Sequence, residues 1–145
     1  MPRALHHLDL WVRDAATGIG EWGWLLGEVG WAVEFQEAAT ASWQHDDGTY
    51  VFLQAVVDEP GREPGHEHGH GHDHEHGHDR MLPGINHLAL TTDTRAALDR
   101  LRAESSEHGW HELFADRYPH AGGEDHTALY LENAEGFEVE IVVGD

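Results

Sequence analysis

Hydrophobic and polar residues alternate along two short segments of the chain, and each segment carries a histidine where a strand would begin. Residues 5–12 read LHHLDLWV and residues 85–92 read INHLALTT. Because successive side chains of a strand point to opposite faces, one face of each segment carries the histidine, His7 or His87, and the other carries leucine. We expect the leucine face to pack on a helix and the histidine to lie on the opposite face.

The same order of elements follows both of these strands. After the first, Asp14 is a plausible helix cap, and three more strands end in TYVFLQAVV at residues 49–57. After the second, we expect Asp93 to cap a helix over residues 94–105, and three strands end in FEVEIVVG at residues 137–144. Each half of the chain is therefore predicted to be a βαβββ module.

The two modules are separated by a segment rich in proline, glycine, histidine and acidic residues. Histidine occupies every even position from 66 to 78, and the segment has almost nothing to bury. We therefore divide the chain into a first module (1–57), a His-rich acidic linker loop (58–82) and a second module (83–145). The loop has two interpretations: metal storage or delivery, because alternating imidazoles chelate divalent ions, or a tolerated low-complexity insertion.

Composition narrows the classes of function. The chain has 145 residues and no cysteine, so any metal ion would be held by nitrogen and oxygen atoms. Its 28 acidic and 8 basic residues give a formal charge of −20, which repels phosphate, so nucleic acid is not an expected partner. No apolar run reaches the roughly 18 residues of a membrane span, and no signal-peptide pattern is present. We expect no membrane association and a cytoplasmic location.

Polar residues on the last strand of each module add to the two histidines. Gln54 lies on that strand in the first module and Glu140 in the second. Together with His7 and His87 they give the two modules a set of possible metal ligands, although a histidine at a strand start can also be a satisfied polar residue. We interpret Glu138 as a solvated acid or as a partner of a ligand.

Three segments in this order resemble the vicinal oxygen chelate superfamily of glyoxalases, bleomycin-resistance proteins, fosfomycin-resistance enzymes and extradiol dioxygenases. They are HHLDLWVRD (6–14), NHLALTTD (86–93) and LYLENAEGFEVEIV (129–142), and residues 114–142 also look like uncharacterised bacterial members. The resemblance covers nearly the whole chain outside the linker. It implies an α+β fold in which two βαβββ modules form a cup-shaped, curved mixed sheet, with the modules paired within one chain or exchanged between two. A homodimer is expected.

The resemblance places metal-binding positions on His7, His87 and Glu140. Gln54 falls where many bacterial glyoxalases have a fourth, acidic ligand, and glutamine is neutral and weaker, which speaks against a four-ligand glyoxalase site. Two imidazoles and one carboxylate suit a divalent ion such as Zn²⁺, Ni²⁺, Mn²⁺ or Fe²⁺. The alternative is a metal-free cup in which these residues hydrogen-bond to one another or to a ligand, as bleomycin-type members imply.

The loop DRYPHAGGEDH (116–126) offers candidates for proton transfer at the rim of the cup. Tyr118, His120 and His126 are the residues of suitable chemistry, although His120 could equally be an exposed residue of a turn shaped by its proline and glycine neighbours. Four aromatic residues are expected to line the substrate pocket, namely Trp11, Trp43, Phe52 and Tyr130.

Two function classes follow from these residues. The first is a metal-dependent enzyme of the glyoxalase or dioxygenase type, a lyase, isomerase or ring-cleaving oxygenase acting on adjacent oxygens of a small molecule. The second is a protein that sequesters an antibiotic-like aromatic ligand without chemistry. The ligand-type residues favour the enzyme, whereas Gln54 and the tryptophans are compatible with the binding protein.

Overall fold

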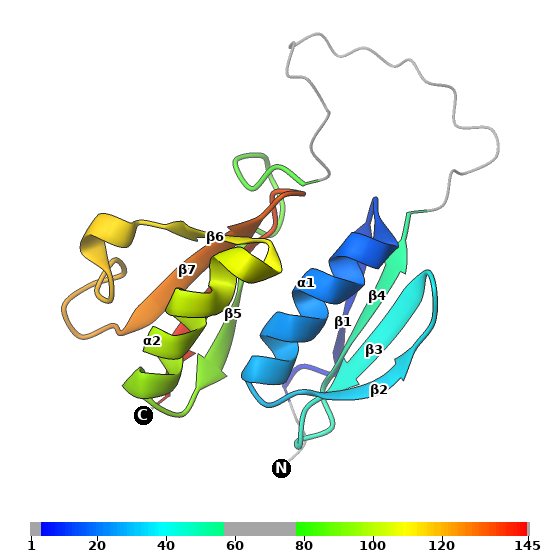
Figure 1. Ribbon diagram of the computed structural model, residues 1–145, viewed down its shortest axis with the longest axis horizontal. Helices are drawn as coiled ribbons and strands as arrows, with labels where there is room; N and C mark the ends of the chain where they lie inside the picture. The colour runs from blue at the N-terminus through cyan, green and yellow to red at the C-terminus, as the bar shows by residue number, and fades with distance from the viewer. Residues whose placement is uncertain (1–3, 57–77, 145) are drawn as a thin grey trace, which may run out of the picture.

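The computed structural model of the protein describes residues 4–56 and 78–144 and contains two βαβββ modules (Figure 1). The His-rich run predicted to be a linker lies outside the described residues, except for His78. The first module consists of β1 (His7–Val12), α1 (Ala15–Glu28), β2 (Ala32–Gln36), β3 (Thr40–Gln44) and β4 (Tyr50–Ala55). The second consists of β5 (His87–Thr92), α2 (Arg95–Glu104), the 3₁₀ helix η1 (Ser105–His108), β6 (Trp110–Leu113), the 3₁₀ helix η2 (Ala115–Arg117), β7 (Ala128–Asn133) and β8 (Glu138–Val143).

The strands form two mixed four-stranded sheets with the orders β1-β4-β3-β2 and β5-β8-β7-β6. The pairs β1–β4 and β5–β8 are parallel, and the other neighbours are antiparallel. Figure 1 shows α1 and α2 side by side on one side of the sheets, with the edge strands β1 and β5 facing each other. The predicted α+β fold of two βαβββ modules is confirmed, and the two sheets are open rather than closed into a barrel.

Local sequence explains where the helices begin. Asp14 caps α1 as predicted, because its side chain accepts a hydrogen bond from the backbone amide of Thr17 at 3.1 Å. In the second module the cap is Thr94, which accepts from Ala97 at 3.1 Å, so the helix begins one residue later than a cap at Asp93 would give.

The two modules pack on each other within one chain. The indole of Trp110 on β6 donates to the backbone carbonyl of Glu21 on α1 at 3.0 Å, and Asn133 donates to the Glu21 carboxylate at 2.9 Å. On the other side of the contact, the Glu135 carboxylate accepts from the backbone amide of Arg13 at 2.9 Å. The structure therefore shows the arrangement in which modules pair within the chain, and the homodimer stays a prediction. Within the described segments, no helix combines the length and the apolar character that crossing a membrane would need.

Candidate functional site

Glu140 is the centre of the candidate site. Its neighbours on β8, Val139 and Ile141, are fully buried on the helix side of the sheet, so Glu140 projects from the open face. Even there the residue is only 6% exposed. A carboxylate so far removed from water requires partners.

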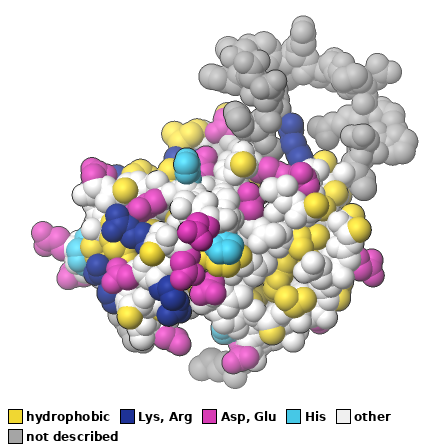
Figure 2. Space-filling model, viewed as in Figure 1, with side chains coloured by type: hydrophobic (Ala, Val, Ile, Leu, Met, Phe, Trp, Pro, Cys, Tyr) yellow, Lys and Arg dark blue, Asp and Glu magenta, His cyan; other side chains and the backbone are white. Residues whose placement is uncertain are grey.

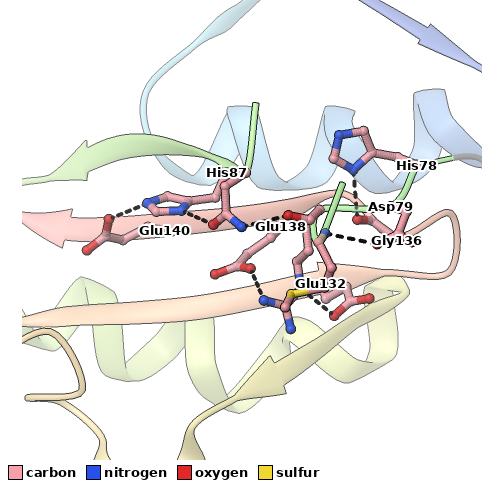
Figure 3. Close-up of polar contacts among 10 residues, drawn as sticks. His78, Asp79, His87, Glu132, Gly136, Glu138 and Glu140 are labelled. Atoms are coloured by element: carbon pink, nitrogen blue, oxygen red, sulfur yellow. Dashed lines mark hydrogen bonds and ion pairs between the residues drawn. The ribbon is translucent and has the colours of Figure 1, made fainter. Parts of the chain in front are cut away.

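Three side chains supply those partners. His87 Nε2 at the start of β5 lies 3.2 Å from Glu140 Oε2, the Tyr130 hydroxyl on β7 donates to Oε1 at 2.7 Å, and His126 Nε2 also contacts Oε1. Figure 3 shows His87 and Glu140 pointing toward each other from neighbouring strands. These four residues are referred to below as the Glu140 cluster.

The environment fixes the charge states of two members of the cluster. Burial acts to raise the pKa of Glu140, but the hydrogen bonds from His126 and Tyr130 and the nearby imidazoles outweigh it, so the pKa lies below its ordinary value of 4.5. Burial, reinforced by the hydrogen bond to Glu140, raises the pKa of Tyr130 to about 12. At neutral pH the cluster therefore contains an ionised Glu140 and a protonated Tyr130.

His87 is held between two hydrogen-bond acceptors. The Asn86 amide group is oriented by its Nδ2, which donates to the Arg80 carbonyl at 2.9 Å, and this leaves Oδ1 facing His87 Nδ1 at 2.8 Å. A neutral imidazole has one N–H group, so if Nδ1 donates to Asn86, Nε2 presents a lone pair to the Glu140 carboxylate. The other neutral tautomer would instead leave Nδ1 without a proton for Asn86, so only a second proton on the ring, or a cation between Nε2 and Glu140, makes both contacts favourable at once.

The acidic neighbour Glu138 is buried and is not a solvated residue. Arg80 Nη1 lies 2.7 Å from Glu138 Oε2, and Arg80 Nε lies 3.5 Å from Glu132 Oε2 on β7. Figure 3 shows Glu132 and Glu138 on adjacent strands beside the segment that carries His78 and Asp79. Arg80 thus compensates both carboxylates, and Glu140 is left as the carboxylate that faces the imidazoles.

The ligand positions of the first module do not join this cluster. His7 stacks on Tyr50, with ring centroids 4.8 Å apart, and its Nδ1 lies 2.9 Å from that of His6. Gln54 pairs in register with Trp11 at the opposite end of β1 from His7. No contact among the described residues brings His7 or Gln54 to Glu140, and within residues 4–56 and 78–144 no three His, Asp or Glu side chains form a ready-made metal site.

The predicted proton-transfer residues separate in the structure. Tyr118 lies on the α2 side, where its hydroxyl donates to Asp99 at 2.6 Å and its ring lies 4.1 Å from the Arg102 guanidinium, so its assignment to the cup rim is corrected. Burial and the Asp99 contact raise the pKa of Tyr118 to about 12. His120 donates to the His126 carbonyl at 3.2 Å and shapes the loop. Of the three candidates, His126 reaches Glu140.

The aromatic residues also divide between the two faces. Trp43 is fully buried against α1, where a Cβ at Gly23 would lie 3.3 Å from its ring, so its assignment to the pocket is corrected. The alternation of residues along β3 indicates that Trp43 is in the core. Trp43 lies on the same face as Ala41, whereas the polar residues Thr40, Ser42 and Gln44 lie on the other face. The other three predicted aromatics, Trp11, Phe52 and Tyr130, lie on the open face by the same alternation.

Sequence reasoning missed Asn86 and Arg80. Asn86 immediately precedes β5, and Arg80 follows the His-rich run, so neither belongs to an alternating strand pattern. The histidine beside Asn86 was the available signal, because the second ring nitrogen of a functional histidine commonly has its own acceptor.

Comparisons with known proteins agree with this architecture. Residues 6–130 match the model of the Glyoxalase/Bleomycin resistance protein/Dioxygenase superfamily. The chain is 30% identical over 138 residues to the uncharacterized protein YqjT of Bacillus subtilis, covering 95% of this chain and 97% of that protein.

Solved structures show the same fold. The crystal structure of a candidate glyoxalase from Bacillus halodurans is 30% identical and superposes with a TM-score of 0.79, covering 97% of this chain and 96% of that one. The fosfomycin resistance protein FosX of Mesorhizobium loti is 16% identical, with a TM-score of 0.56 over 100% of this chain and 94% of that one, and supports the fold alone. The chain belongs to the glyoxalase/bleomycin resistance protein/dioxygenase superfamily.

Proposed function

We propose that the protein is a metal-dependent enzyme that acts on adjacent oxygen atoms of a small molecule, with the Glu140 cluster as its site. The observation that carries this proposal is the position of His87, whose two ring nitrogens both face acceptors, Asn86 Oδ1 and Glu140 Oε2. A divalent cation held by Nε2 and the Glu140 carboxylate would let Nε2 act as a ligand while Nδ1–H donates to Asn86, so both ring nitrogens would have favourable partners.

The donor set of the cluster fits such an ion. His87 and His126 each direct Nε2 at the Glu140 carboxylate, so two imidazole nitrogens and one carboxylate would hold Zn²⁺, Ni²⁺, Mn²⁺ or Fe²⁺. Binding would replace the direct contacts between these side chains. The bound ion would supply Lewis-acid polarisation of the substrate oxygens.

Tyr130 is the hydrogen-bond donor of the proposed site. Its pKa of about 12 keeps the hydroxyl protonated throughout the neutral range, and the group already lies 2.7 Å from Glu140 Oε1. The Phe114 and Tyr130 rings form a T-shaped pair with the centroids 5.5 Å apart, which helps to hold the phenol at the cluster. Tyr130 can therefore donate a hydrogen bond to an oxygen atom that approaches Glu140.

Metal binding by the cluster can be measured once chelation by the His-rich run is removed. The starting protein is the full chain with the six histidines at even positions from 66 to 76 replaced by serine, and with His78 retained because it stacks on Phe137 at 4.8 Å. After dialysis against Zn²⁺ or Ni²⁺, we expect about one ion per chain. Glu140→Gln should lose it, and His111→Ala, an exposed histidine on β6, should retain it.

A second readout tests whether the bound ion recruits a ligand with adjacent oxygens. Catechol presents two adjacent oxygens, and we expect calorimetry to show its binding to the metal-loaded protein and not to the metal-free protein or to Glu140→Gln. Retention of the ion by Glu140→Gln would contradict the proposed site. Equal binding of catechol with and without metal would instead support a protein that sequesters its ligand without chemistry.

A further inference from the structure

A cavity of about 280 Å³ lies between β1 and β5, where the two modules meet. Its inner wall is apolar and includes Leu10, Trp22 and Phe137, of which Trp22 is fully buried. Since an engineered apolar cavity of about 150 Å³ accommodates benzene, a space of this size can hold one substituted ring. This cavity is separate from the contacts of the Glu140 cluster, although His87 belongs to both.

The rim of the cavity exposes apolar side chains. Trp11 is 46% exposed and Ile85 is 66% exposed, and both line the opening from the facing ends of β1 and the segment before β5. Large side chains left this open to water beside a cavity are typical of a ligand-binding site. The indole of Trp11 also offers an aromatic face to which a cation is attracted.

Two acidic residues line the cavity, and one of them has no counter-charge among the described residues. Asp9 lines it, is exposed on the same face of β1 as Trp11, and has no hydrogen bond or ion pair with any of the described residues. The other lining acid, Glu138, is already paired with Arg80 at 2.7 Å. Neither lysine nor arginine lines the cavity among the described residues, and the chain as a whole has no lysine. An unpaired carboxylate beside an exposed indole is complementary to a positive charge.

We propose that this cavity binds a small organic cation, an amine whose apolar or aromatic body enters between Leu10, Trp22 and Phe137 and whose charged nitrogen pairs with Asp9 over Trp11. An anionic ligand would meet the unpaired Asp9 carboxylate there, with no lysine or arginine in the described lining to attract it, and would be repelled. This cation site lies beyond the Glu140 cluster and does not require a metal ion. A ligand bound in this way lies beside His87, next to the proposed reaction site.

Three probes of the same size isolate the role of charge. They are 2-phenylethylammonium, its neutral counterpart 2-phenylethanol and the anion phenylacetate, each titrated into the full-length protein and followed by tryptophan fluorescence and ligand-observed NMR. We expect the amine to bind with a Kd of about 1 mM, roughly fivefold tighter than the alcohol at ~0.15 M salt. Phenylacetate should not bind measurably.

Two variants that each remove one negative charge test whether the preference for the amine depends on Asp9. Asp9→Asn should abolish the preference for the amine while leaving alcohol binding unchanged, and Asp116→Asn, an exposed acid on η2, should leave the preference intact. The proposal is overturned if the amine shows no saturable binding, or if it binds no tighter than the alcohol. It is also overturned if Asp9→Asn retains the preference, or if both variants reduce it equally, because the negative charge of the whole chain would then explain the binding.

Discussion

Asn86 controls which nitrogen of His87 faces Glu140. Its Oδ1 lies 2.8 Å from His87 Nδ1, and its Nδ2 is fixed by the Arg80 carbonyl. Removing such an acceptor from a ligand histidine commonly weakens metal binding tenfold or more. We therefore expect Asn86→Ala to raise the Kd for Zn²⁺ about tenfold, measured by competition with a chelator in the protein that lacks the linker histidines.

Two further variants separate this role from a general loss of structure. Asn86→Asp keeps an acceptor at the same place and should bind the ion more tightly than Asn86→Ala, while Gln44→Ala, an exposed residue on β3, should behave as the unmodified protein. If Asn86→Ala and Gln44→Ala bound Zn²⁺ equally well, Asn86 would have no positioning role.

The residues of the cluster could be predicted from the sequence only in part. Strand alternation predicts that His87 lies opposite the leucine face of its strand and that Glu140 is a polar residue on one face of the last strand. In the structure, the side chains of His87 and Tyr130 both contact the Glu140 carboxylate. Alternation does not fix which rotamer a side chain adopts or what it contacts across elements. His7 has the same strand position as His87 and stacks on Tyr50 instead, because the partner strand offers an aromatic ring at that register.

The segment from residue 78 to residue 86 ties the end of the linker to the second sheet. His78 Nδ1 contacts the Gly136 carbonyl at 3.1 Å, and Arg80 pairs with Glu138 on β8. The Glu138 side chain is 3% exposed and that of Arg80 is 25% exposed. Loss of the guanidinium would leave a buried carboxylate without its counter-charge.

We therefore expect Arg80→Met to lower the free energy of unfolding by about 2 kcal/mol, less than for a fully buried pair because Arg80 is partly hydrated. Urea denaturation measures this change. Adding Glu138→Gln removes the orphaned charge and should restore most of the stability. A double variant as unstable as Arg80→Met alone would show that Arg80 acts through packing rather than through its charge.

At the level of elements, periodicity predicted the order βαβββ in both modules, and the structure confirms it. It predicted β2 as a strand but not the shift in its register between Val33 and Phe35, because a bulge changes the pairing of two strands without a fixed pattern of residue types. It also did not predict that α2 begins at Arg95. The first residue of the helix depends on whether the Asp93 or the Thr94 side chain accepts a hydrogen bond from a free backbone amide of the first turn, and both residue types can do so.

The packing of the whole molecule places Glu21 between the modules. Burial, opposed by the hydrogen bond from Asn133 and reinforced by the charges of Glu135 and Asp14, raises the pKa of Glu21 above 4.5. Because the pKa of Glu21 is higher in the folded than in the unfolded protein, protonation of Glu21 stabilises the fold. This stabilisation is complete at pH values below the unfolded-state pKa and is lost as the pH rises through the folded-state pKa. At neutral pH the ionised Glu21 therefore destabilises the contact between modules.

Glu21→Gln keeps an acceptor for Asn133 and removes the charge. We expect it to raise the free energy of unfolding by about 1 kcal/mol near pH 7.5, and the gain should shrink as pH falls toward about 4.5. Thermal unfolding at both pH values tests this, with Glu37→Gln, an exposed acid, as the control that should show no gain. A gain of equal size at both pH values would mean that ionisation of Glu21 is not its cause.

In the proposed site, one metal ion is held within the second module by His87, His126 and Glu140. The most direct measurement is the metal content of His126→Ala compared with that of His7→Ala, both in the full chain with the linker histidines replaced. Since His126 Nε2 contacts Glu140 and His7 stacks on Tyr50, we predict that His126→Ala loses the ion and that His7→Ala keeps about one ion per chain. Retention by His126→Ala together with loss by His7→Ala would contradict this ligand set and place the ion between the two modules.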